Sequence, residues 1–412
     1  MSWRSSFHEF SRHHALPQEL RHFFFGIFFY RLGAGLISLT GPLFLFTIGQ
    51  NFPWLQNVPL NTVSKGLFFV FASYLLERLW ILLLTQPIAR WIPRIGFHTS
   101  MVLGLLFLSA RTALFDFFLR VPSLWPLAML LAALGVQFFW IGYHTYFTLE
   151  AKSSKIGSEV GGIEFMSRLA QVLTPLLGAL IAGTFGFAVS LWTGIVLYGV
   201  AIAFLLHLPK LQSKYSWQWS DFWQWLTDRD LRRTTLALAA YTWEELGVIV
   251  FWPIFLFITF GNVESVGYIL STASFLSLLF IYLSGWVFDH KKKRIGSIQK
   301  MSGILLSFLW IPRLIFAGSP VVLVLNDAID RLTHSVYSTL FYASMLFCAR
   351  GKHVYRFFVN RQVAISLLWS VLLLLSMALL FLHWNWILLF ASFFGAGMMS
   401  LLFTKEVKKL KL

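Results

Sequence analysis

The sequence predicts an all-α membrane protein in which twelve transmembrane helices form two pseudo-symmetric six-helix bundles. The first observation behind this prediction is composition. Of the 412 residues, 58% are hydrophobic and 12% are charged, and the mean hydropathy is +0.71. Soluble domains carry about 25% charged residues. The second observation is a repeat, because the Arg-Ile-Gly sequence at 94–96 recurs at 294–296. Membrane chains built from two similar halves commonly bind their ligands between the halves.

Apolar segments follow one another along most of the chain. A membrane-spanning helix needs about 20 mostly apolar residues. Lys and Arg gather in alternate connections between these segments, as the positive-inside rule describes for cytoplasmic loops. An even number of spans then places both termini in the cytoplasm. The predicted spans are 22–48, 62–86, 97–119, 123–149, 157–184, 187–208, 234–260, 265–288, 297–317, 320–349, 357–382 and 384–404.

The longest connection divides the chain and sets the predicted domain boundaries. In this connection Trp217, Trp219, Trp223 and Trp225 alternate with polar residues. This pattern predicts a short segment at the membrane interface, with the indoles at headgroup depth. The predicted order is a cytoplasmic tail at 1–21, an N-terminal bundle at 22–208, a cytoplasmic or interfacial linker at 209–233, a C-terminal bundle at 234–404 and a cytoplasmic tail at 405–412.

The formal net charge of +16 raises the question of nucleic-acid binding. Because the basic residues lie mainly in one set of loops and in the tails, anionic lipid at the inner surface explains them better. The polar first 21 residues predict a cytoplasmic tail rather than a cleavable signal peptide. We therefore expect an integral protein of the bacterial inner (plasma) membrane that is a monomer in contact with membrane lipids and has no nucleic-acid partner.

The repeat and the loop positions resemble the major facilitator superfamily of transporters. In that family the loops after spans two and eight carry a Gly, an Asp and a basic-Gly cluster, which resemble a charge latch that steadies one conformation. The second half approximates this pattern. The first half lacks the acidic residue, so the resemblance does not imply a charge latch there. The gating-loop residues implied by the resemblance are Gly285, Asp289, Arg294 and Gly296 in the second half, and Arg90, Arg94 and Gly96 in the first.

The fifth predicted span carries a partial form of a Gly-Pro signature seen in many exporters of this family. Pro175 and Gly178 match it, and other glycines are replaced. Small residues permit close helix approach, and proline loosens a helical turn. Ordinary helix packing explains these residues at least as well. The resemblance therefore favours efflux only slightly.

Acidic residues within the spans are the main functional candidates, because an intramembrane charge is costly unless it is paired or faces water. Asp327, Asp330, Arg331 and His334 share one face of the tenth span by their spacing. Glu244 and Glu245 lie near the middle of the seventh span. Adjacent residues diverge by about 100° on a helix, so we expect one to face a cavity and the other to face a neighbouring helix. Such acids suit proton coupling or the attraction of a cation.

Further candidates lie in the first half. His144 occupies a place in the fourth span comparable with that of His334, and this pair of histidines predicts substrate or proton binding. Arg31 in the first span could meet an anionic group of a substrate or neutralise an acid from another helix, and Glu77 is a further acid in the second span. Glu164 and Arg168 are four residues apart and predict an intrahelical ion pair.

The leading hypothesis is a secondary transporter that moves a small solute by alternating access with protons as the coupling ion. A lipid or amphiphile transporter and a receptor or scaffold on a transporter fold are the alternatives. The sequence holds no phosphate-binding loop, no zinc pattern, no nucleophile motif and a single cysteine, Cys348. We therefore expect no enzymatic activity, no cofactor and no metal. Substrate charge stays open among cation, anion and zwitterion.

Overall fold

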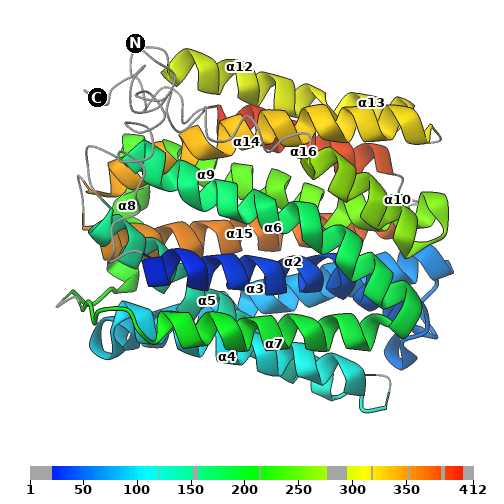
Figure 1. Cartoon of the computed structure of the whole chain (residues 1–412), viewed down its shortest axis with the longest axis horizontal. Helices are drawn as coiled ribbons and strands as arrows, with labels where there is room; N and C mark the ends of the chain where they lie inside the picture. Colours follow the sequence, from blue (N-terminus) through cyan, green and yellow to red (C-terminus); the bar gives the residue numbers. More distant parts are fainter. Residues whose placement is uncertain are drawn as a thin grey trace, which may run out of the picture.

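Helices provide the regular secondary structure in the computed structural model, which describes residues 21–118, 120–151, 156–212, 215–275, 295–316, 319–350, 353–381 and 386–401. The helices run roughly parallel or antiparallel to one long axis (Figure 1). Their bounds are α2 (Arg21–Gln50), α3 (Thr62–Ile95), α4 (Phe97–Leu114), α5 (Leu124–Glu150), α6 (Ile156–Phe185), α7 (Phe187–Leu205), α8 (Trp219–Thr227), α9 (Arg229–Leu246), α10 (Trp252–Phe260), α12 (Ile295–Phe308), α13 (Trp310–Ile315), α14 (Pro320–Arg350), α15 (Val354–Leu380) and α16 (Trp386–Ser400). Residues 263–275 are also helical.

Eight helices of the described chain are long and apolar enough to cross a membrane. They comprise the first six predicted spans, the seventh as Arg232–Phe260, and the eleventh as Val354–Leu380. The tenth, α14, is long enough but carries the charged cluster that the sequence analysis singled out. The predicted eighth span continues beyond the described residues. Overall, the helices are those of an integral membrane protein.

Two predicted spans are interrupted where a proline removes a backbone hydrogen bond. The ninth predicted span divides at Leu309 into α12 and α13, because Pro312 cannot donate to the carbonyl of Phe308. The seventh contains a π-helical turn, η4 (Gly247–Phe251), directly before Pro253. Such turns are common at functional sites, and this one lies close to Glu244 and Glu245.

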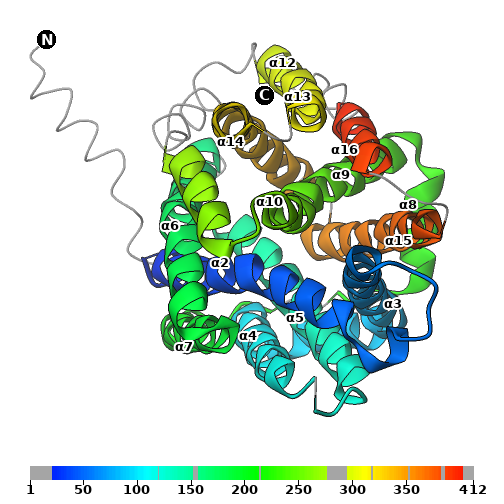
Figure 2. The same cartoon turned by 90° about the vertical axis from the view of Figure 1, so that its right-hand side faces the viewer.

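Helices from the two halves of the sequence pack side by side. Helices α2–α7 contact one another, as do α9, α12, α14, α15 and α16. Between these groups, α3 packs against α15, and α6 packs against α14, as the end-on view shows (Figure 2). Helices α5 and α2 also contact α14 and α10 respectively. The exact domain boundaries stay a prediction.

The linker is folded more tightly than its sequence predicts. Helix α9 begins at Arg229, inside the predicted linker. The indoles of Trp217 and Trp225 are buried, and only Trp223 is fully exposed. Trp217 Nε1 donates a hydrogen bond to Asn360 Oδ1 at 2.7 Å. Trp217 and Trp225 therefore pack on protein, and the depth of the four indoles in the membrane stays a prediction.

Candidate functional site

A cavity lies between the first-half helices and α14. Its empty volume is about 360 Å³, and its walls come from α2, α5, α6 and α14. Because α14 belongs to the second half of the sequence, the cavity occupies the place where a protein of two similar halves is expected to bind ligands. The polar and aromatic residues in its wall are Arg31, Trp140, Tyr143, His144, Phe147, Glu164 and Tyr342.

Arg31 presents a positive charge to this cavity. Its guanidinium carbon lies 5.6 Å from the ring centroid of Tyr30 and 5.3 Å from that of Trp140. These ring faces stabilise the cation by cation–π attraction. The Nε atom is buried and has no hydrogen-bond partner among the described residues. Arg31 therefore keeps unused donor capacity.

His144 is the second buried polar group of the cavity wall. Its ring stacks on Phe358 at 5.1 Å and on Trp140 at 5.4 Å between centroids. The side chain is 5% exposed, yet its Nε2 atom has no hydrogen-bond partner within the described chain. A buried polar atom without a partner is unfavourable by about 1–3 kcal/mol. A ligand in the cavity could supply that partner.

The two adjacent glutamates of α9 face different surroundings. Glu245 accepts a hydrogen bond from Tyr342 Oη at 3.4 Å, and Tyr342 lines the cavity. Glu244 is 0% exposed and accepts from Trp310 Nε1 at 3.2 Å. The expected divergence of these neighbours is therefore present in the geometry.

Glu164 also lines the cavity, but the expected pair with Arg168 is not formed. Arg168 instead donates to Gln171 Oε1 at 2.7 Å, one turn further along α6. The i, i+4 spacing made the pair possible, but the rotamer of Arg168 favours the amide. Glu164 therefore presents its carboxylate to the cavity without an ion pair to Arg168.

A second polar cluster lies inside the second-half helices, around a buried arginine. Arg313 of α13 is 0% exposed. Its NH2 atom lies 3.1 Å from Asp327 Oδ1 and 3.0 Å from Asp330 Oδ2. Arg331 adds a third contact, 2.8 Å from its Nε to Asp327 Oδ2. Helical spacing predicts that the α14 residues of this cluster share one face, but it does not indicate Arg313, which comes from another helix.

Tryptophan faces enclose the Arg313 guanidinium. Its central carbon lies 4.3 Å from the ring centroid of Trp310 and 4.5 Å from that of Trp252. The Trp-Ile-Pro-Arg sequence ending at Arg313 was the available signal, because it places a cation beside an aromatic residue within an apolar span. Two carboxylates and two rings make this cation a fixed part of the interior.

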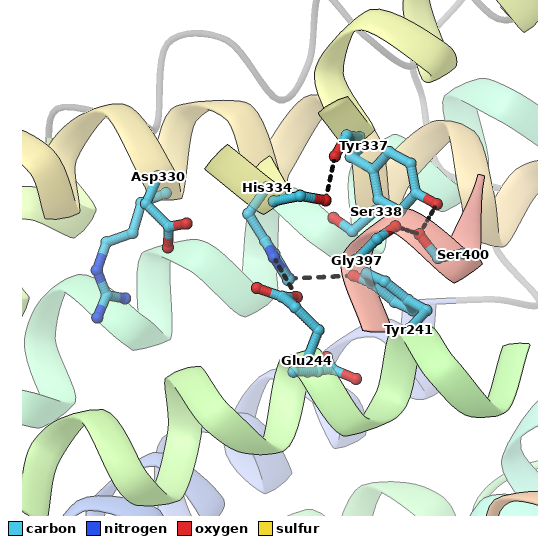
Figure 3. Close-up of polar contacts among 12 residues, drawn as sticks. Tyr241, Glu244, Asp330, His334, Tyr337, Ser338, Gly397 and Ser400 are labelled. Carbon is cyan, nitrogen blue, oxygen red and sulfur yellow. Dashed lines mark hydrogen bonds and ion pairs between the residues drawn. The ribbon is translucent and has the colours of Figure 1, made fainter. Parts of the chain in front are cut away.

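Glu244 and His334 face each other next to this cluster (Figure 3). His334 Nδ1 lies 3.8 Å from Glu244 Oε2, and His334 Nε2 lies 3.0 Å from Tyr241 Oη. His144 and His334, predicted as a pair, therefore lie in different surroundings. His144 lines the cavity, and His334 contacts the cluster inside the second-half helices.

Glu77 lies apart from both clusters. It forms a buried ion pair with its neighbour Arg78 at 2.6 Å. The guanidinium carbon of Arg78 lies 4.2 Å from the ring centroid of Trp369 on α15. This arrangement neutralises the Glu77 carboxylate locally and joins α3 to α15.

Contacts between the halves close the end of the molecule where α8 lies (left in Figure 1). Arg350, at the end of α14, donates to the Thr148 carbonyl at 2.8 Å and also to the Ala151 carbonyl, both at the C-terminal end of α5. Tyr355 Oη donates to the Ala89 carbonyl at 2.7 Å. A cation at a helix C-terminus is favourable because the last carbonyls are unpaired. Sequence analysis did not identify Arg350.

The opposite end is also held together across the halves. The Leu176 amide donates to Ser271 Oγ at 2.9 Å. At Gly267, a β-carbon would lie 2.6 Å from the Pro175 carbonyl oxygen, so no larger residue fits without movement. Pro175 is therefore at a close contact between helices, whereas a β-carbon at Gly178 would meet only side chains at 3.3 Å and beyond.

The predicted gating loops are described only in part. Gly96 has φ +97° and joins α3 to α4, and the linker docks there through Gln212, which donates to the Arg94 carbonyl at 2.7 Å. The side chains of Arg90 and Arg94 are exposed. Gly296 lies in the first turn of α12. Gly285, Asp289 and Arg294 lie outside the described residues.

Replacing Arg350 tests which residues hold the α8 end closed. We expect Arg350→Gln to increase maleimide labelling of Cys348, the sole cysteine, by about tenfold or more, because hydrogen bonds to charged groups contribute about 1.5–3 kcal/mol. Arg94→Gln is the matched control and should label at the wild-type rate. Equal labelling rates in the two variants would assign no closing role to Arg350.

Comparisons with known proteins bear on the fold. No family model and no curated protein matches the sequence. Among solved structures, the crystal structure of the human organic anion transporter MFSD10 (TETRAN) matches with a TM-score of 0.64 and 13% identity, over 94% of this chain and 100% of that chain. At this identity the match shows the fold alone: the helices of this chain are arranged as in that transporter. The fold class expected from the sequence is therefore confirmed.

Proposed function

We propose that this protein is a secondary transporter that carries a small organic anion across the membrane by alternating access with proton coupling. The observation that carries the proposal is the cavity between α2, α5, α6 and α14, with Arg31 and the unpartnered His144 Nε2 in its wall. The proposal includes that the protein transports its substrate and does not act as an enzyme on it.

The charge around the cavity favours an anion over a cation. Glu245 interacts electrostatically with three arginines and one further acid, namely Arg31, Arg168, Arg361 and Glu164. These arginines outnumber the two acids by one formal charge. A monovalent anion would balance that difference, and an acid group that offers two oxygens fits the donor fork of Arg31. The similarity to an organic anion transporter supports the same class.

The aromatic wall favours an organic body on that anion. Trp140, Tyr143, Phe147 and Tyr342 offer ring faces, while His144 can donate one hydrogen bond. Aromatic and apolar walls with a few placed polar groups are typical of small-molecule sites. The proposed orientation places the acid group at Arg31 and the apolar part against these rings.

Alternating access would proceed by opening one set of contacts between the halves while the other stays closed. The Arg350 and Tyr355 contacts would separate at the α8 end, and the Leu176–Ser271 contact at the other. The excess of Lys and Arg in the α8-side loops supports a cytoplasmic placement of that end, in a bacterial inner membrane. Pro175 leaves a slight preference for efflux.

Exchange in proteoliposomes tests the proposed function. Three probes of similar size differ in charge: toluene-4-sulfonate, benzyltrimethylammonium and benzamide. We expect protein-dependent uptake of labelled toluene-4-sulfonate that is accelerated by the same unlabelled anion on the opposite side. Protein-free vesicles are the control. Uptake of the cation alone, or no acceleration from the opposite side, would contradict the proposal.

A further inference from the structure

We propose that Glu244 and His334 form the proton-binding site of this protein, enclosed by second-half helices and separate from the cavity that receives the anion. The inference rests on the proposed function, because it names where the coupled proton is held. Of the candidate acids, it assigns proton binding to Glu244, with His334 as its partner. Asp327 and Asp330 then serve to fix Arg313 rather than to exchange protons.

The geometry of the pair leaves two facing polar atoms unused. Glu244 Oε2 and His334 Nδ1 are both buried without a hydrogen-bond partner among the described residues, and they lie 3.8 Å apart. The other polar atom of each side chain has a hydrogen-bond partner. Glu244 Oε1 accepts from Trp310 Nε1 at 3.2 Å, and His334 Nε2 is hydrogen-bonded to Tyr241 Oη at 3.0 Å. A hydrogen bond between nitrogen and oxygen needs about 2.7–3.2 Å, so a small approach would let a proton bridge the pair (Figure 3).

Charge balance indicates how many protons the pair holds. The adjoining cluster contains two acids and two bases, Asp327, Asp330, Arg313 and Arg331, and is therefore neutral. An uncompensated charge among these buried side chains would cost several kcal/mol. Glu244 and His334 must then share one ionisable proton, either as carboxylic acid with neutral imidazole or as carboxylate with imidazolium. Releasing that proton leaves a net negative charge.

The charged and titratable groups around the pair come from four helices. On α9 they are Tyr241 and Glu245, on α13 Arg313, on α14 Asp327, Asp330, Arg331 and Tyr337, and on α6 Arg168, which acts on His334. Described residues of α16 contribute no charge. Arginines therefore act on His334, whereas Glu244 is repelled by Asp330 and Glu245 and attracted by Arg313.

A short route of side chains connects the pair with the cavity. The Tyr241 ring lies 6.0 Å from the Tyr342 ring between centroids, and Tyr342 lines the cavity. Tyr342 also donates to Glu245. An anion bound at Arg31 would change the hydrogen bonding of Tyr342 and, through Tyr241, that of His334. The proton released by Glu244 would pass to His334 Nδ1 and leave from the opposite ring nitrogen when water reaches it.

Infrared spectroscopy tests the site without any substrate. In purified full-length protein, acidification should increase a carboxylic-acid carbonyl band that is lost in Glu244→Gln. Glu77→Gln is the matched control, because Glu77 is also a buried intramembrane glutamate, and this variant should retain the band. A pH-dependent band that survives unchanged in Glu244→Gln would overturn the assignment.

Transport provides a second readout that separates failure of this inference from failure of the proposed function. With toluene-4-sulfonate, the ratio of accumulation driven by a pH gradient to exchange at equal pH should fall to about one-tenth or less in Glu244→Gln and stay at the wild-type value in Glu77→Gln. A wild-type ratio in Glu244→Gln would overturn the inference alone. Wild-type protein that exchanges no anion would overturn the proposed function, while the infrared result would still decide the site.

His334→Gln keeps the proposal testable if Glu244→Gln does not fold. Without the imidazole, neutrality requires a permanently protonated Glu244. The carbonyl band should then persist in alkaline buffer, and accumulation should be lost. A band that still disappears on alkalinisation, together with normal accumulation, would contradict the proposal.

Discussion

Replacing Arg31 with glutamine should weaken binding of toluene-4-sulfonate by about 10- to 100-fold, since hydrogen bonds to charged groups contribute about 1.5–3 kcal/mol. Arg31 is the cation of the cavity wall, and its Nε atom has no partner among the described residues. Glutamine keeps a polar side chain but removes the charge and the planar donor fork. Isothermal titration calorimetry on purified protein would measure the change.

A matched control isolates the effect of position from the effect of losing an arginine. Arg111 of α4 also lies within the membrane region, with its guanidinium carbon 4.6 Å from the Phe115 ring centroid, but it does not line the cavity. Arg111→Gln should bind toluene-4-sulfonate as the wild type does. Benzamide should bind the wild type and Arg31→Gln alike. Equal losses of toluene-4-sulfonate affinity in the two arginine variants would contradict a specific anion-binding site at Arg31.

Apolar patterning predicted the helices because spanning a bilayer imposes a length and a composition on each segment. The repeat at 94–96 and 294–296 predicts similar halves, and its two glycines differ locally. Gly96 adopts a positive φ between helices, whereas Gly296 lies within the first turn of α12. Local conformation depends on neighbours such as the linker, which docks only on the first copy among the described residues.

The sequence predicts which residues are candidates for the sites, but it does not predict which of them contact one another. Spacing placed Asp327, Asp330 and His334 on one face of α14, because helical periodicity is a local property. Their partners Arg313 and Glu244 come from other helices, so only tertiary packing reveals them. The same reason explains the failed Glu164–Arg168 pair and the missed Arg350. Sequence spacing cannot show which of two reachable groups a long side chain contacts.

Removal of the Arg313 charge should cause the largest loss of stability. Arg313→Met keeps an apolar side chain between Trp252 and Trp310 but leaves Asp330 without its cation and Asp327 with Arg331 alone. Breaking a buried ion pair by removing one partner costs about 3–5 kcal/mol. The variant should therefore unfold at a clearly lower temperature than the wild type in the same detergent, as intrinsic tryptophan fluorescence would record.

A double variant decides whether the loss comes from the uncompensated carboxylate or from altered packing. Asn at position 330 removes the charge that Arg313 balances, so Arg313→Met with Asp330→Asn should recover most of the lost thermal stability. Arg331→Met is the milder comparison, because Arg331 contacts one aspartate and is slightly exposed. If the double variant were no more stable than Arg313→Met, packing around the two tryptophans would explain the loss. Recovery would instead identify Arg313 as the counter-charge of Asp330.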